Sequence, residues 1–190
     1  MVILILTGIT LNLNRLRIKN FMQQPLKFLL LFAAAYIVFN LVYQAILYTW
    51  SPLPDPFTLG VTRLTIAMFP DLTYQTITNI PGYKIMDKES VIVNIKEGCN
   101  GIAVWISVLC FIFAFRSNLK AYLCYIPLSF ILIQISNILR LYILIRIKRN
   151  EPQYFNFFHT YAFPAIIYFF AFLLMVLWVK KFVKPATHFK

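Results

Sequence analysis

The sequence predicts an all-α integral membrane protein, a four-transmembrane-helix bundle with a small outer insertion. Of its 190 residues, 61% are hydrophobic and only 13% are charged. A soluble domain of this size and composition would leave much apolar surface in water. The chain also has four apolar runs without charge, each close to the roughly 20 helical residues that cross a bilayer core. These runs are residues 28–48, 101–115, 121–139 and 157–179.

Lysine and arginine predict the orientation, because they accumulate on the cytoplasmic side of a membrane. An N-terminal arm at residues 1–27, the loop after the second run and a tail at residues 180–190 hold ten of the 18 cationic residues. All six acids fall on the other side. We therefore expect both termini in the cytoplasm, and we interpret the net charge of +12 as an anchor on anionic lipid, without nucleic-acid binding. The acids are Asp55, Asp71, Asp87, Glu89, Glu97 and Glu151.

We expect a single membrane domain over residues 1–190, in which the third span continues to residue 147. The outer insertion, residues 49–98, has too little apolar content to fold alone and should pack on the outer mouth of the bundle. Three prolines within residues 51–56 forbid helix there.

Within the insertion, the residues that follow the prolines predict a short interfacial helix at 57–69. Alternating, β-branched flanks around a turn at residues 87–90 then predict a small hairpin, with strands at 83–86 and 91–95. The hairpin leads directly to residues 97–101, which contain the first candidate functional residue.

Three cysteines are present, but their spacing does not indicate a disulfide framework. Cys110 lies about 16 Å of helix beyond Cys99, and Cys124 lies at the cytoplasmic end of the third span. No C-x-x-C pair occurs, which argues against a dithiol redox enzyme.

Cys99 stands between Gly98 and the pair Asn100-Gly101, just before the second span begins on the outer face. A helix N-terminus presents backbone N–H groups that stabilise a thiolate or a developing oxyanion. The sequence therefore predicts a nucleophile at this position. The alternative is a small apolar residue that fills the top of the bundle.

Gln134, Asn137 and Arg140 form a polar stripe at i+3 spacing on a third span made otherwise of leucine and isoleucine. Such a stripe should face the bundle. Arg140 lies about 30 Å of helix beyond Lys120, near the outer end of the span. Charge at this depth is rare and usually functional, although a snorkelling arginine is the alternative interpretation.

His159 opens the fourth span on the same outer face, whereas His188 lies in the cytoplasmic tail. Three separate helices thus bring Cys99, Arg140 and His159 to one depth. A cysteine nucleophile needs only one histidine as general acid and base. One histidine and one cysteine, with Glu97 as a third ligand, are a poor set for a metal, so we predict no metal and no cofactor.

These residues resemble the exosortase/archaeosortase family of membrane transpeptidases, and most closely its Bacteroidetes-type exosortase F branch. Residues 97–102, Glu-Gly-Cys-Asn-Gly-Ile, are similar to the family's nucleophile motif, with Asn100 where serine is commoner. Asn137-Ile-Leu-Arg140 is similar to its Asn-x-x-Arg motif, and Phe158-His159 to its histidine at the head of the next span. The similarity covers about the last two-thirds of the chain, which has fewer spans than many relatives.

The resemblance implies a multi-pass protein of the bacterial cytoplasmic membrane with its active site on the periplasmic face. Relatives cleave C-terminal sorting signals of exported proteins, which consist of a short motif, a transmembrane helix and a basic tail, and pass the acyl group to an amine acceptor. It implies Cys99 as nucleophile, Arg140 as oxyanion or thiolate partner and His159 as proton donor. We expect Glu97, Asn100 and Asn137 to contact substrate.

Two other classes remain open from the sequence. A membrane cysteine protease would use the same residues and release the acyl-enzyme with water. A non-enzymatic scaffold or accessory protein of a surface-export system is the second alternative. A transporter is disfavoured because the spans lack the acidic residues of a proton or cation relay, and no Gly-x-Ser-x-Gly of a serine hydrolase occurs.

Overall fold

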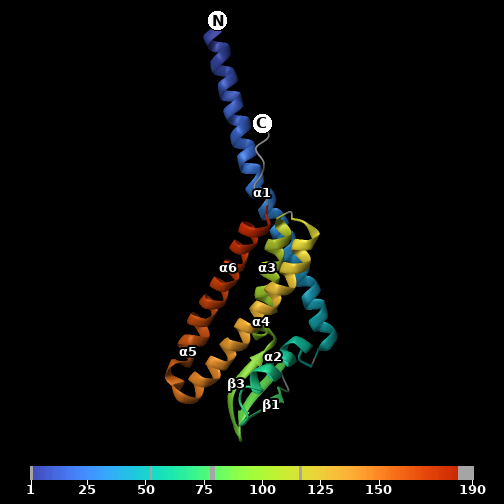
Figure 1. The fold of residues 1–190 in the computed structure, drawn as a ribbon, viewed down its shortest axis with the longest axis vertical. Coiled ribbons are helices and arrows are strands. Elements are labelled where there is room, and N and C mark those ends of the chain that lie inside the picture. Colours follow the sequence, from blue (N-terminus) through green and yellow to red (C-terminus); the bar gives the residue numbers. More distant parts are fainter. Residues whose placement is uncertain (1, 52, 78–79, 116, 184–190) are drawn as a thin grey trace.

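The computed structural model describes residues 2–51, 53–77, 80–115 and 117–183, with side chains from Leu26 onward. This part of the chain is mostly helical and contains one small sheet (Figure 1). The long helices are α1 (Val2–Trp50), α4 (Leu119–Asn150) and α6 (Phe163–Phe182). The shorter elements are α2 (Pro56–Ile66), α3 (Ile102–Ala114), α5 (Phe155–Phe157), β1 (Leu72–Thr76), β2 (Gly82–Asp87) and β3 (Ser90–Lys96).

Within the described residues, three helical segments are long and apolar enough to cross a membrane: Leu26–Trp50, Leu119–Asn150 and Pro152–Phe182. They contain the predicted spans at residues 28–48, 121–147 and 157–179. Large apolar side chains on them are open to the outside, among them Leu41 (64% exposed), Leu123 (68%) and Phe169 (62%). Apolar surface of this extent is typical of helices that lie in lipid. The predicted second span forms α3, an apolar helix of 13 residues.

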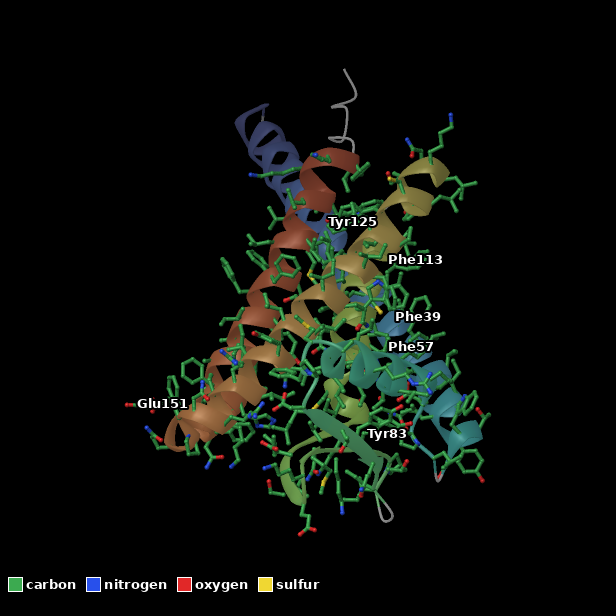
Figure 2. All side chains as sticks on the ribbon, turned by 60° about the horizontal axis from the view of Figure 1, so that its bottom comes forward. Phe39, Phe57, Tyr83, Phe113, Tyr125 and Glu151 are labelled. Carbon is green, nitrogen blue, oxygen red and sulfur yellow. The ribbon has the colours of Figure 1, made fainter. Side chains whose placement is uncertain are left out.

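The short helix α3 lies at the centre of the bundle, in contact with α1, α4 and α6. Its residues Val108, Cys110 and Ile112 are completely buried. On one side Phe39 of α1 stacks on Phe113, with ring centroids 5.7 Å apart (Figure 2). The other helices pack around most of α3, so most of its apolar residues are buried in protein, although Phe113 is 47% exposed.

The packing between α4 and α6 is built around Trp178, which is fully buried. Its ring lies 5.2 Å from that of Tyr125 and 5.3 Å from that of Tyr122. The Tyr125 hydroxyl donates to the Leu174 carbonyl at 2.6 Å, so this buried phenol has a hydrogen-bond partner, as buried polar groups require.

The insertion contains a three-stranded antiparallel sheet in the order β1-β2-β3. The predicted hairpin is confirmed: β2 pairs with β3 around a turn in which Lys88 has φ 54°. The strand β1 was not predicted, because its residues Leu-Thr-Tyr-Gln-Thr bury only the leucine. The predicted interfacial helix is α2, which ends at Ile66, since Met68 and Phe69 close tight turns on Thr65 and Ile66.

The sheet packs on the extension of α4 beyond the bundle. Ile85 and Ile95 of the sheet are fully buried and share one cluster with Val61 of α2 and with Leu141 and Ile145 of α4. The insertion therefore completes its core with residues of a long apolar helix, as its small size demanded.

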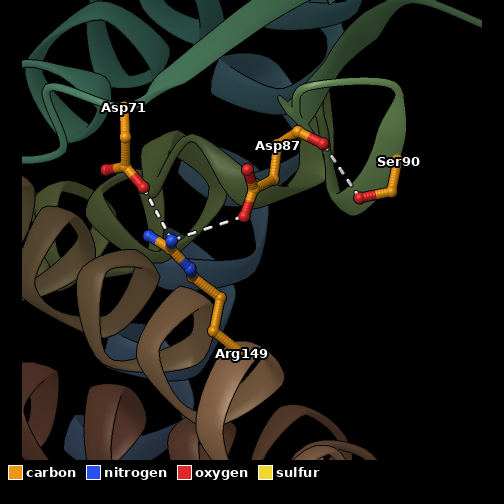
Figure 3. A network of polar contacts seen from close by, with 4 residues as sticks. All are labelled: Asp71, Asp87, Ser90 and Arg149. Carbon is orange, nitrogen blue, oxygen red and sulfur yellow. Dashed lines mark hydrogen bonds and ion pairs between the residues drawn. The ribbon is translucent and has the colours of Figure 1, made fainter.

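An ion pair also joins the sheet to α4. Nη2 of Arg149 lies 2.6 Å from Asp71 Oδ2 and 3.3 Å from Asp87 Oδ2 (Figure 3). The hydrogen bond from Arg149 lowers the pKa of Asp71 below its ordinary value. The end of α4 is thereby connected to the ends of two strands.

The acidic residues lie towards one end of the long axis of the molecule. The sheet lies at one end, and the C-terminal end of α6 with its Lys180 and Lys181 lies at the other, together with the early part of α1 (Figure 1). Glu151, at the end of α4, lies at the same end as Tyr83 of the sheet (Figure 2). The acids of the insertion and Glu151 therefore lie at the sheet end, as the sequence predicted.

Candidate active site

The loop at residues 97–101 connects the sheet to the bundle. Where β3 ends at Lys96, residues Glu97–Cys99 form a single 3-10 turn, and α3 begins at Ile102. Gly101, the residue before α3, has φ +79°, a left-handed conformation that favours glycine. A Cβ there would lie 3.4 Å from the Cβ and Cγ of Asn137. The glycine allows the chain to turn tightly into α3 against α4.

Cys99 is partly exposed and lies two residues before Gly101. Its side chain packs against the apolar cluster that joins the sheet to α4. Its carbonyl oxygen accepts a hydrogen bond of 2.8 Å from Asn137 Nδ2. The structure therefore brings together two predicted site residues that are 38 positions apart.

Asn100 is only 1% exposed, and its side chain is held by three other elements. Its Oδ1 accepts from the Ile102 N–H at 3.0 Å. Its Nδ2 donates to the Tyr43 hydroxyl (2.7 Å), Thr58 Oγ1 (3.2 Å) and Asp55 Oδ2 (3.3 Å). Asn100 was predicted as a substrate contact, whereas this geometry uses its amide within the protein.

Asp55 was not predicted as a site residue. It is fully buried and precedes Pro56, the first residue of α2. Its Oδ1 accepts from the N–H groups of Phe57 (2.8 Å) and Thr58 (3.0 Å), the pattern of an N-cap. An Asp-Pro pair before an apolar helical run is a sequence signal for such a cap, but it does not indicate the contact with Asn100.

Glu97 lies beside this buried carboxylate. Its Oε1 accepts a hydrogen bond of 3.3 Å from the backbone N–H of Asp55. Partial burial raises the pKa of Glu97, and the negative charge of Asp55 adds to the rise, against the lowering effect of that N–H. Glu97 is thus connected to the start of α2, and its protonated form is favoured more than that of a free glutamate.

The polar stripe of α4 faces the interior, as the sequence predicted, with Gln134 and Arg140 partly buried. Asn137 is fully buried. Among the described residues, several buried polar atoms of the stripe have no hydrogen-bond partner: both amide atoms of Gln134, Oδ1 of Asn137 and Nε of Arg140. Unsatisfied polar groups in a low-dielectric setting are costly, and such groups call for a functional or structural explanation.

His159 lies in η3, a π-helical turn at Phe158–Ala162, and is exposed. Its ring stacks on Phe155 with centroids 5.5 Å apart, and Phe155 packs against the same cluster as Cys99. π-Helical turns are rare and frequently occur at functional sites.

The three predicted catalytic residues thus come from three elements at the sheet end of the bundle. Cys99 and Asn137 are joined directly, and Arg140 lies one helical turn beyond Asn137. His159 lies on a separate element and stacks on Phe155, which packs against the same apolar cluster as Cys99. In the part of the chain that the structure describes, no group of three or more metal-ligating side chains could hold a metal ion.

The chain matches no protein-family model, no curated protein and no solved structure. Function is therefore inferred from the residues and geometry of the site itself. The arrangement offers a partly exposed thiol, a guanidinium with an unpartnered N–H and an exposed imidazole. A thiol, a guanidinium and an imidazole are the groups that a cysteine nucleophile, an oxyanion donor and a proton-transfer residue require.

Proposed function

We propose that this protein is an exosortase-like cysteine transpeptidase or peptidase that cleaves C-terminal sorting signals of exported proteins at the outer face of a bacterial cytoplasmic membrane. The observation that carries the proposal is the hydrogen bond from Asn137 to the Cys99 carbonyl. It connects the two motifs of the resemblance, Glu-Gly-Cys and Asn-x-x-Arg. If the likeness of the two motifs to the family were a coincidence, there would be no reason for their residues to contact each other in the fold.

The proposal includes four spans. In this proposal three long helices cross the membrane on the outside of the bundle: α1 from Leu26, α4 and α6. The 13-residue α3 crosses between them. At about 1.5 Å per residue, α3 is about 20 Å long, shorter than a typical hydrocarbon core of about 30 Å. Burial by three neighbours supports a short crossing, because the loops at its ends are then sheltered by protein.

The proposed reaction begins when the Cys99 thiol loses its proton to His159 and attacks the scissile carbonyl carbon. Arg140 stabilises the oxyanion of the tetrahedral intermediate. The C–N bond then breaks, His159 gives the proton to the departing amine, and the acyl group remains on Cys99 as a thioester. An amine acceptor, or water in the peptidase variant of the proposal, attacks this thioester and frees the thiol.

A substrate anchored by a transmembrane helix fits this arrangement. Its helix would lie beside the bundle in lipid, and its basic tail would remain at the end of α6 that holds Lys180 and Lys181. The cleavage motif, at the other end of the substrate helix, would then reach the depth of Cys99. Partial exposure of Cys99 supports access from the outer side.

The experiment that tests the proposal compares secreted and surface proteins from the wild-type strain and from a strain that lacks this gene. We expect a set of proteins with C-terminal transmembrane helices to shift to larger apparent mass in the deletion strain. Expression of Cys99→Ala should not restore processing, whereas Cys110→Ala and Cys124→Ala should restore it. Restored processing with Cys99→Ala would exclude the nucleophile, and with it the proposed function.

Arg140→Lys tests the electrophilic role separately. The planar guanidinium can hold an oxyanion through two donors, while lysine offers a point charge on a flexible stem. We expect Arg140→Lys to insert normally and to lose most processing. Full processing by Arg140→Lys would exclude a specific role for the guanidinium in oxyanion stabilisation and would mean that only a positive charge is needed at this position.

A further inference from the structure

We infer that Asp55 is a positioning residue for Cys99 and acts through Asn100. The inference rests on the proposed function for its catalytic consequence, but its structural part can be tested without a substrate. Asp55 and Asn100 lie 45 positions apart, one at the start of α2 and the other just before α3. The contact between them connects the insertion to the residue that follows the nucleophile.

The two oxygens of Asp55 have separate tasks. Oδ1 caps α2 through the N–H groups of Phe57 and Thr58. Oδ2 accepts from the Thr58 hydroxyl at 2.6 Å and from Asn100 Nδ2 at 3.3 Å. A completely buried carboxylate must be compensated by hydrogen bonds. A cap alone would need only Oδ1, so the second oxygen is the group that acts on the nucleophile loop.

The backbone around Cys99 is consequently held from two sides. On one side Asn137 of α4 donates to the Cys99 carbonyl. On the other, Asn100 is attached to α2 and to Tyr43 of α1, while its own Oδ1 closes the turn into α3. A reacting atom must be held closely to be effective. The thiol is left as the free part of a residue whose main chain is fixed.

Two substitutions separate this role from helix capping. Asp55→Asn keeps an oxygen for the cap but can present an NH₂ group, which cannot accept, towards Asn100. Thr58→Val keeps the shape and the Asp55 charge while it removes the hydroxyl that lies between Asp55 and Asn100. Thr62→Val is the matched control, because Thr62 is also a fully buried threonine of α2 and its hydroxyl has no partner among the described residues.

The first measurement is the rate of alkylation by iodoacetamide of the full-length protein in detergent, with Cys99 and Cys110 followed separately by mass spectrometry. Release of the loop exposes Cys99, so Asp55→Asn and Thr58→Val should raise its rate by about 3- to 10-fold, the factor for one ordinary hydrogen bond. Thr62→Val should match wild type. Cys110, fully buried in α3, should stay unreactive in all of them.

A double-mutant cycle tests the route through Asn100. In an Asn100→Ala background the contact is already lost, so Asp55→Asn should not raise the Cys99 rate further. An unchanged Cys99 rate in both Asp55→Asn and Thr58→Val would overturn the inference. A parallel rise at Cys110 would also overturn it, since the substitutions would then loosen the whole bundle.

The second measurement is processing of surface proteins in the complemented deletion strain. Asp55→Asn and Thr58→Val should process about 3- to 10-fold more slowly while their Cys99 is alkylated faster. These opposite signs are the mark of lost positioning, because a merely more accessible thiol would not slow the reaction. If wild type processes no protein, the proposed function fails, and the alkylation rates still decide whether Asp55 holds the loop. Normal processing by both variants would refute the positioning role.

Discussion

Asn137→Ala is the most informative single substitution for the site. Asn137 is fully buried in α4 and donates its 2.8 Å hydrogen bond to the Cys99 carbonyl. Truncation removes the donor and leaves the partly buried Cys99 carbonyl without this partner. Its effect on the free energy of unfolding therefore measures how firmly α4 holds the nucleophile loop.

The expected magnitude follows from the contact. An unsatisfied buried carbonyl costs about 1–3 kcal/mol, and the higher helix propensity of alanine returns up to about 0.7 kcal/mol. We expect the protein to lose about 1–2 kcal/mol of stability. For a chain of this length, 1 kcal/mol corresponds to about 2–4 °C in Tm, so Tm should fall by a few degrees.

Gln134→Ala is the matched control, one turn earlier on the same helix. Both amide atoms of Gln134 are buried without a partner among the described residues. Their removal deletes no hydrogen bond, and we expect a change within about 0.5 kcal/mol or a gain in stability. Thermal unfolding of both variants in one detergent, followed by tryptophan fluorescence, gives the comparison.

Equal destabilisation by the two substitutions would refute this reasoning. It would mean that Gln134 has a partner that matters as much as the Cys99 carbonyl, or that the hydrogen bond of Asn137 contributes little. A stable Asn137→Ala would likewise separate α4 from the nucleophile loop. It would also remove the observation that carries the proposed function.

Three further outcomes are expected. Gly101→Ala should lower the stability measured by thermal unfolding by about 1–2 kcal/mol, because Gly101 has a positive φ. Gly60→Ala, in the middle of α2 where an added Cβ meets no atom within 4 Å, should raise stability by up to about 1 kcal/mol. A stabilising Gly101→Ala together with a destabilising Gly60→Ala would contradict this reasoning. An impermeant maleimide should label Cys99 from outside intact cells, and labelling only from the cytoplasm would invert the topology. Because Asp71 has a lowered pKa in the folded protein, its pairing with Arg149 stabilises above the unfolded pKa of about 3.9 and is lost as the pH falls through the folded value. Arg149→Gln should therefore lower Tm at pH 7, and this difference should shrink as the pH falls below the unfolded pKa of about 3.9. A loss in Tm that does not change with pH would exclude this ion pair as the cause.

Much of the architecture could be predicted from local patterns. The apolar runs that form the three long helices needed only composition and length, because a bilayer constrains both. The hairpin at β2 and β3 followed from alternation around a turn. The strand β1 could not be predicted, since Leu72 is its one buried residue and its pairing partner lies across residues 77–81. Strand pairing of that kind is decided by the sheet it joins.

The sequence by itself determined that the chain forms long apolar helices suited to a membrane and that the acids of the insertion lie at one end; the common depth of Cys99, Arg140 and His159 stays a prediction. Each of these follows from residue type and spacing along a single helix or loop. Only the tertiary structure decided that Asn100 turns inward to Asp55, that Asn137 holds the Cys99 carbonyl, and that most of α3 is enclosed by its neighbours. The two hydrogen bonds join residues that are 38 and 45 positions apart, and contacts over such separations produce no periodic pattern in a sequence. They depend on how the chain packs, because a buried polar group takes whichever partner the fold brings within reach.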